Sequence, residues 1–75
     1  MIIKIEFDCK EDEKDNILKE LKNMFGNKII TAHRAYRNYC VMLQNGTASD
    51  IGLAKDFLDK SYKENKVSYC SIGHF

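Results

Sequence analysis

Residues 2–25 read IIKIEFDCKEDEKDNILKELKNMF, and the spacing of the apolar residues changes once within this stretch. At its start Ile3, Ile5 and Phe7 alternate with charged residues, and this period of two predicts a half-buried strand. In its second half the apolar residues recur three or four positions apart, which predicts one face of an amphipathic helix that stops at Gly26. The chain therefore opens with a strand followed by a helix.

Two short segments after this helix predict a hairpin. Residues 28–36 and 39–44 are rich in β-branched and aromatic side chains, and Arg37 and Asn38 lie between them. This composition is typical of two antiparallel strands joined by a turn.

A second helix and a last strand are expected in the remainder of the chain. Thr47 and Asp50 have the spacing of a capping box, which places the start of the helix near them. The apolar residues that follow at helical spacing are Ile51, Ala54, Phe57, Leu58 and Tyr62. Residues 67–72 then predict a strand, followed by a short tail.

This order of elements, βαββαβ, is that of the split-βαβ, ferredoxin-like superfold. We therefore expect residues 1–75 to form one α+β domain with a four-stranded antiparallel sheet in the strand order 4-1-3-2. Right-handed connections place both helices on one face of that sheet. The predicted core consists of Ile3, Ile5, Phe7, Ile17, Leu18, Leu21, Phe25, Ile51, Phe57 and Leu58.

Composition narrows the classes of partner and the compartment. Twelve Lys and Arg residues against eleven Asp and Glu residues give a net charge of +1, which argues against binding nucleic acid by charge alone. No apolar run approaches the roughly 20 residues of a membrane span, and Lys4 and Glu6 interrupt the N-terminal apolar stretch, so neither a membrane segment nor a signal peptide is expected. We expect a cytoplasmic protein.

The three cysteines, Cys9, Cys40 and Cys70, do not form the CxxC pairs of metal sites or redox motifs. Each lies in or beside a predicted strand, where a free cysteine commonly acts as a small buried apolar residue. We expect no metal site and no cofactor.

The sheet face opposite the helices is the first candidate binding surface. If Ile3, Ile5 and Phe7 face the helices, Lys4 and Glu6 face outward. Residues 39–43 are apolar at every position, so either Cys40 and Met42 or their neighbours must also face outward.

Two explanations for this apolar outer surface remain open. Long side chains such as Lys4 and Tyr36 can lie across it, or a second copy of the chain or another partner can cover it. Lys4, Glu6, Cys40 and Met42 are the candidate residues of this face, and we expect a homodimer.

The predicted hairpin is the second candidate surface. Its residues His33, Arg34, Tyr36, Arg37 and Tyr39 include both arginines, one of the two histidines and two of the four tyrosines of the chain. Arg and Tyr are enriched at binding hot spots, which predicts that these five residues contact a protein partner. The alternative is an exposed hairpin whose arginines discourage pairing of an edge strand.

A nucleic-acid-binding role is a further alternative. Residues 37–41, RNYCV, resemble the opening of the third-strand motif of RNA-recognition motifs. That resemblance implies an RNA or DNA partner bound by stacking on the sheet. Asn38 stands in place of the motif's glycine, Val41 in place of its second aromatic residue, and Lys4 in place of the first-strand aromatic.

A catalytic role is the last alternative. Residues 5–8, IEFD, resemble the end of the first strand in the small ferredoxin-like endonucleases associated with CRISPR arrays and in related toxin-type ribonucleases. The resemblance implies that Asp8 from two copies holds Mg²⁺ and cleaves nucleic acid.

Of these alternatives the sequence favours a small, non-catalytic protein-binding or regulatory module. Its rich use of lysine, isoleucine and asparagine suits an accessory protein of a bacterium or phage, including an inhibitor of a host defence complex.

Overall fold

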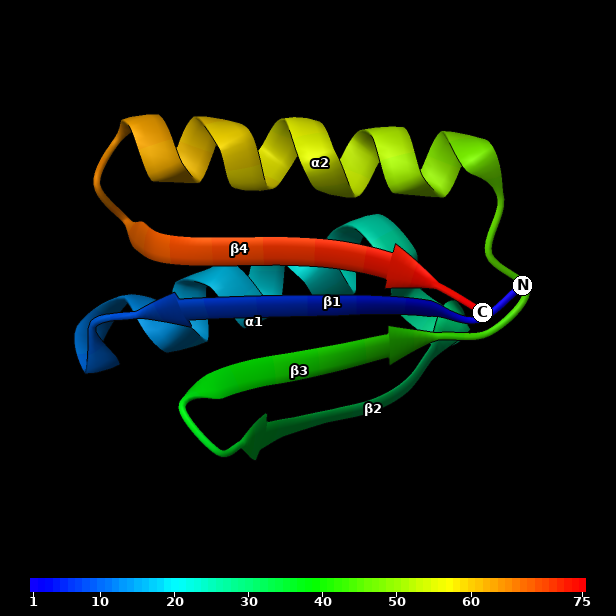
Figure 1. Cartoon of the computed structure of the whole chain (residues 1–75), viewed down its shortest axis with the longest axis horizontal. Helices are drawn as coiled ribbons and strands as arrows, with labels where there is room; N and C mark the ends of the chain where they lie inside the picture. Colours follow the sequence, from blue (N-terminus) through cyan, green and yellow to red (C-terminus); the bar gives the residue numbers. More distant parts are fainter.

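The computed structural model describes residues 1–75 and has the element order βαββαβ (Figure 1). The elements are β1 (Ile3–Cys9), α1 (Glu11–Phe25), a short 3₁₀ turn (Gly26–Lys28), β2 (Ile29–Ala35), β3 (Asn38–Leu43), α2 (Ala48–Lys63) and β4 (Val67–His74). The predicted α+β, ferredoxin-like architecture is thereby confirmed.

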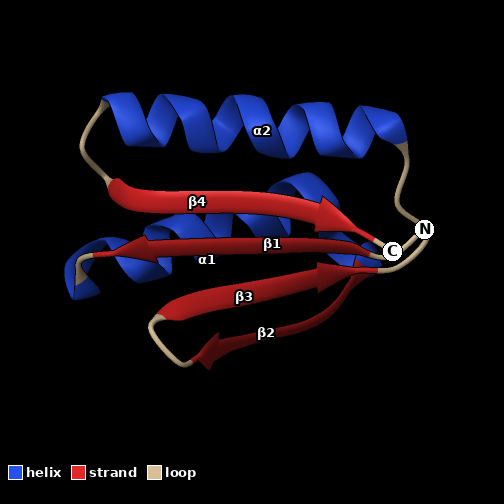
Figure 2. Ribbon diagram, in the orientation of Figure 1, coloured by secondary structure: helices blue, strands red, loops and turns tan.

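The four strands form one antiparallel sheet in the order β2-β3-β1-β4, as predicted, with β1 and β3 in the centre (Figure 2). Ile5 of β1 lies opposite Val41 of β3 on one side and Ile72 of β4 on the other. Because side chains alternate along a strand, this register decides which residues face the helices and which face away. Both helices pack on the face that carries Ile3, Ile5 and Phe7.

The core between the sheet and the helices consists of twelve buried side chains: Ile3, Ile5, Phe7, Ile17, Leu21, Phe25, Tyr39, Val41, Leu43, Ala54, Leu58 and Val67. Three predicted core residues, Leu18, Ile51 and Phe57, are only partly buried and pack at its margin. Each fully buried Ile, Leu, Val or Phe side chain of the core contributes about 1.5–3 kcal/mol to the free energy of folding.

The inner face of α2 differs from the prediction at two residues, because Ser61 is buried in it and Tyr62 is not. Ala54, Leu58 and Ser61 face the sheet, whereas Tyr62, which was predicted to share the apolar stripe, is 55 % exposed. Spacings of four and three residues keep the first three on one side of a helix, and Tyr62 lies one position further round. The buried Ser61 hydroxyl donates a hydrogen bond to the Phe57 carbonyl oxygen at 2.9 Å, so it is not left without a partner.

The predicted capping box at the start of α2 is confirmed. Thr47 Oγ1 accepts a hydrogen bond from the Asp50 backbone N–H at 3.2 Å, and the Asp50 carboxylate accepts one from the Thr47 N–H at 3.0 Å. The same carboxylate pairs with Lys28 Nζ at 2.7 Å, which ties the start of α2 to the turn before β2. The Lys28 hydrogen bond, followed by the Thr47 bonds, lowers the pKa of Asp50 below its ordinary value.

The start of β1 is fastened to the loop that precedes α2. The Gly46 N–H donates to the Met1 carbonyl oxygen at 2.8 Å, and a Cβ atom on Gly46 would lie 2.6 Å from Ile3 Cγ1 and closer still to Cδ1. Glycine is therefore needed at position 46 by the space available. Phe75 N–H also donates to the Ile2 carbonyl oxygen at 2.9 Å, so β1 and β4 stay paired up to the chain ends.

Candidate partner-binding surfaces

The five hairpin residues predicted to form one contact surface are divided between two sides of the sheet and the turn. The connection between β2 and β3 is a two-residue turn made of Tyr36 and Arg37, because Ala35 pairs with Asn38. The prediction of Arg37 and Asn38 as the turn was therefore wrong by one residue. We call Tyr36 and Arg37 the hairpin tip.

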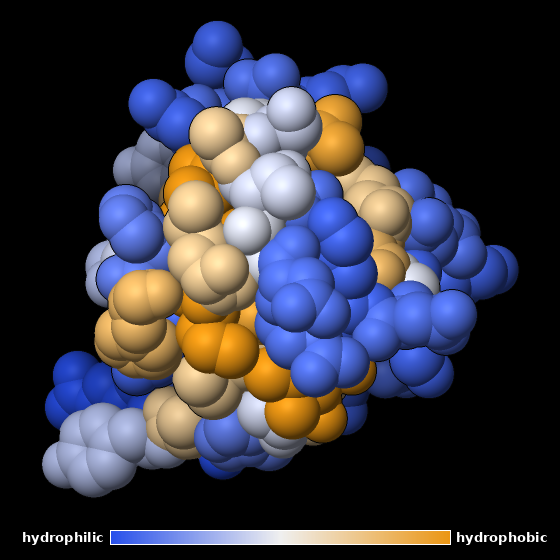
Figure 3. Space-filling view, turned by 90° about the vertical axis from the view of Figure 1, so that its right-hand side faces the viewer, coloured by the Kyte–Doolittle hydropathy of each residue, from blue (hydrophilic) through white to orange (hydrophobic).

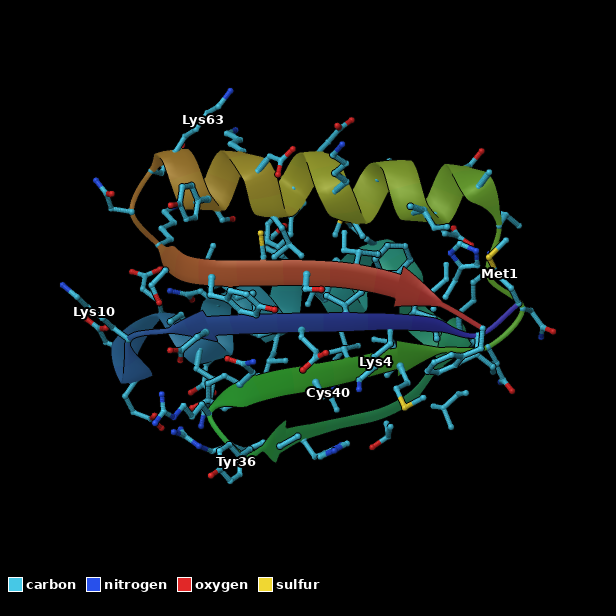
Figure 4. The ribbon with its side chains drawn as sticks, viewed as in Figure 1. Met1, Lys4, Lys10, Tyr36, Cys40 and Lys63 are labelled. Carbon is cyan, nitrogen blue, oxygen red and sulfur yellow. The ribbon has the colours of Figure 1, made fainter.

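Tyr36 has an unusual conformation and exposure. Its φ is +59°, and its side chain is 94 % exposed (Figure 4). Two-residue hairpin turns that need a positive φ normally use Gly, Asn or Asp, because a Cβ atom makes this region unfavourable. The isolated fold gains no packing from this tyrosine in return.

Arg34 lies on the side of the sheet that faces the helices, as does Tyr39, the residue paired with it. Its Nη1 donates a hydrogen bond to Tyr39 Oη at 3.2 Å, and the guanidinium carbon lies 5.3 Å from the centre of the Tyr39 ring. Tyr39 Oη in turn donates to Glu11 Oε2 at 3.0 Å, and Lys14 Nζ lies 3.2 Å from Glu11 Oε1. We call these four residues the Tyr39 cluster.

The Tyr39 cluster joins the hairpin to the first turn of α1. The Tyr39 ring stacks on Phe7 with 5.5 Å between ring centres and is only 6 % exposed. The Tyr39 hydrogen bond, then the Lys14 bond, lowers the pKa of Glu11, and Glu11 raises the pKa of Lys14. Tyr39 was predicted to contact a partner, and the structure places its ring in the core, where little of it is accessible.

Register and alternation place fourteen residues on the sheet face away from the helices, which we call the open face. They are Ile2, Lys4, Glu6, Asp8, Thr31, His33, Ala35, Asn38, Cys40, Met42, Tyr69, Ser71, Gly73 and Phe75. Lys4, Glu6, Cys40 and Met42 are therefore together, as one of the two predicted arrangements required. His33 is also here, where its Nδ1 lies 3.2 Å from Thr31 Oγ1.

Much of the apolar surface on β3 is sheltered within a single chain. Cys40 is 2 % exposed although it faces away from the core, and its burial raises the pKa of its thiol. Lys4 lies on the neighbouring strand and pairs with Glu6 at 3.6 Å (Figure 4). Tyr36, which was suggested to lie across the face, projects from the turn instead.

Asp8 lies at the end of β1, next to a register shift between Asp8 and Cys9, and is half-buried beside Tyr69. Its carbonyl oxygen accepts a hydrogen bond from Ser68 Oγ at 3.4 Å. No group of three or more His, Cys, Asp or Glu side chains is arranged to hold a metal ion. The alternative of a metal shared between two Asp8 residues would need a second copy.

Two surface depressions lie beside α1 and the elements that face it. One, between the helices, has a volume of about 500 Å³ and is lined mainly by polar residues such as Glu13 and Lys60. The other, of about 360 Å³, lies between α1 and β2 over an apolar floor of Leu18, Leu21, Ile29, Ala32 and Val41. Both are open and rimmed by lysines.

Sequence reasoning missed several residues of these surfaces. Neither Glu11 nor Lys14 was among the predicted site residues. Gly73 and Phe75 join Tyr69 on the open face because β4 continues to His74 and stays paired with β1 as far as Ile2. Their spacing of two and four residues was a visible signal, but the prediction ended the strand at residue 72.

Comparisons with protein-family models, with curated proteins and with solved structures find no match to this chain. No helix has both the length and the apolar character needed to cross a membrane.

Proposed function

We propose that this chain is a small protein-binding module that recognises a protein partner with its hairpin tip, Tyr36 and Arg37. The observation that carries the proposal is an almost fully exposed tyrosine held at a positive φ. Residues that break local conformational rules without a structural gain are expected at functional positions.

The chemistry of the tip favours a protein partner. A tyrosine ring buries a large area while few torsion angles are fixed, and an arginine beside it can bond a carboxylate through two N–H groups. Both types are enriched among residues that dominate binding energy. The net charge of +1 supplies little of the long-range attraction on which nucleic-acid binding depends.

Arg34 has a different role in this proposal. Its guanidinium is engaged by Tyr39, which is bonded to Glu11 of α1. The Tyr39 cluster therefore holds the base of the hairpin against α1 and orients the tip. Replacing Arg34 should lower thermal stability, whereas replacing Arg37 should not.

A photo-crosslinking residue at position 36, in the cell that naturally makes the protein, tests the proposal. We expect a discrete protein adduct from position 36 and none from position 62, where Tyr62 is exposed on α2. In affinity purification with chains that lack the crosslinking residue, Tyr36→Gly and Arg37→Ala should each abolish capture of the same protein, while Tyr62→Ala should retain it. Capture unaffected by the tip variants, or an adduct removed by nuclease, would overturn the proposal.

The alternative roles make different predictions. A nucleic-acid partner should give binding that falls steeply with salt, because phosphate contacts release counterions. The role of a host-complex inhibitor remains a prediction that depends on which protein is captured.

A further inference from the structure

The residues of the open face are arranged symmetrically about the Ile5–Val41 pair, and the hairpin tip takes no part in this arrangement. On β1, Lys4 and Glu6 lie one residue to either side of Ile5. On β3, Met42 and Cys40 lie one residue to either side of Val41, which is paired with Ile5. Two opposite charges on β1, and two sulfur-containing apolar side chains on β3, thus lie at equal distances from one line across the strands.

The same line continues onto β4. Ile72 pairs with Ile5, and the two exposed aromatic residues Phe75 and Tyr69 lie three residues to either side of it. Phe75 is 73 % exposed and Tyr69 is 47 % exposed. In the end-on view of Figure 3, apolar surface forms a strip at the end of the molecule where the two chain termini lie.

We infer that the open face binds a second copy of this chain, with a two-fold axis that crosses the strands at the level of Ile5. Such an axis reverses the strand direction and places β1 over β1 of the second copy and β4 over its β4. Lys4 then faces Glu6 of the second copy twice, and Phe75 faces its Tyr69 twice. Met42 faces Cys40 of the second copy in the same way.

Charge complementarity favours a second copy of the chain as the partner that covers the open face. A face that carries adjacent opposite charges is complementary to itself only under this rotation, because the lysine of each copy then meets the glutamate of the other. Aromatic side chains at matching positions add apolar contact at one margin. Ile2 of one copy would face Asp8 of the other, and this pair adds no charge or apolar complementarity.

The size of the face sets the expected strength. Four strands about 4.8 Å apart and about six residues long, at about 3.3 Å per residue, cover a projected area on the order of 400 Å² per copy. This lies at the small end of specific interfaces, where association is weak and depends on concentration. The dimer is therefore expected to form at high micromolar concentration. The inference stands apart from the hairpin tip, which lies outside the paired faces.

Charge reversal provides a test that a general loss of solubility or stability cannot imitate. Lys4→Glu and Glu6→Lys are each expected to be monomeric, because each variant places like charges opposite each other twice. A one-to-one mixture of the two variants should dimerise, since every lysine then meets a glutamate across the interface. The double variant Lys4→Glu with Glu6→Lys should also dimerise.

Sedimentation equilibrium from about 10 µM to about 1 mM gives the oligomeric state of each sample. Lys55→Glu, on the exposed side of α2, is the matched charge-reversal control and should behave as the wild type. Circular dichroism melts identify any variant that fails to fold, and Phe75→Ser, at an exposed position, supplies a second interface variant that should weaken the dimer.

Three results would overturn the inference. A wild-type chain that is monomeric at about 1 mM excludes the interface. Single charge reversals that remain dimeric, or a mixture of folded variants that remains monomeric, would show that Lys4 and Glu6 do not meet across the two-fold axis.

Discussion

Replacing Gly46 with alanine should destabilise the fold, and the cause should be a single clash with Ile3. Gly46 is buried and does not have a positive φ, so alanine can adopt its backbone conformation. The new methyl group, however, would lie 2.6 Å from Ile3 Cγ1 and 3.2 Å from the Met1 carbonyl oxygen. Ile3 is fully buried and therefore has little room to move.

The expected magnitude follows from two opposing effects. Inserting a methyl group into a filled core costs about 1–3 kcal/mol, and the lower entropy of the unfolded alanine chain offsets about 0.4–1 kcal/mol. The net loss in the free energy of unfolding should be about 1–2 kcal/mol. Ile3→Ala alone should cost about 2–5 kcal/mol, because it leaves a cavity.

Urea denaturation of the two single variants and the double variant completes a thermodynamic cycle. The loss of unfolding free energy in the double variant should be smaller than the sum of the two single losses by at least about 1 kcal/mol. The reason is that Ile3→Ala removes both atoms that clash with the new methyl group. Gly52→Ala is the matched control, because a Cβ atom there meets no other atom within 4 Å. It should stabilise α2 by about 0.5–1 kcal/mol. Additive losses at positions 3 and 46 would refute the reasoning.

Three further predictions concern the core, the pH dependence of stability and the catalytic alternative. Leu21→Ala should cost about 2–5 kcal/mol of unfolding free energy in urea, since Leu21 is fully buried in the core, and a loss below about 1 kcal/mol would contradict its placement. The lowered pKa of Asp50 means that its ion pair with Lys28 stabilises the fold above the ordinary carboxyl pKa of about 3.9 and is lost as the pH falls through the lower folded value. Stability measured from pH 7 to pH 2 should therefore fall less steeply in Asp50→Asn than in the wild type, and parallel curves would contradict this. Purified protein with Mg²⁺ should not cleave RNA or DNA, and cleavage that disappears in Asp8→Asn would instead support the nuclease alternative.

The order of elements could be predicted because each element carries its own local signal. Alternation at residues 3–7, helical spacing in α1 and the Thr47–Asp50 capping box are all properties of short segments. The strand order followed from the rules that govern connections between such segments. The one-residue error at the hairpin arose because Asn38 resembles a turn residue, while the turn contains Tyr36 at a position that Tyr rarely occupies.

The arrangement of the candidate surfaces could be predicted only in part. Residues 39–43 are apolar at every position, so local pattern could not decide which side faces the core. In the structure Tyr39, Val41 and Leu43 face the core. The Tyr39 hydroxyl is hydrogen-bonded there to Glu11, which lies 28 residues earlier in the sequence. No local pattern indicates such a partner, and for the same reason Arg34 could not be separated from Arg37.

The central position of β1 has a consequence for the order in which the protein can acquire its structure during synthesis. Among the elements described here β1 is synthesised before the others, yet its two neighbours in the sheet are β3 and β4, and β4 is synthesised after the others. The nascent chain can form α1 and the β2–β3 hairpin early, because their contacts are local. The sheet cannot be completed before β4 emerges, and until then the apolar strand β1 has one edge without a neighbouring strand. The time between the synthesis of β1 and that of β4 is therefore the interval in which this chain is most exposed to aggregation and to chaperones.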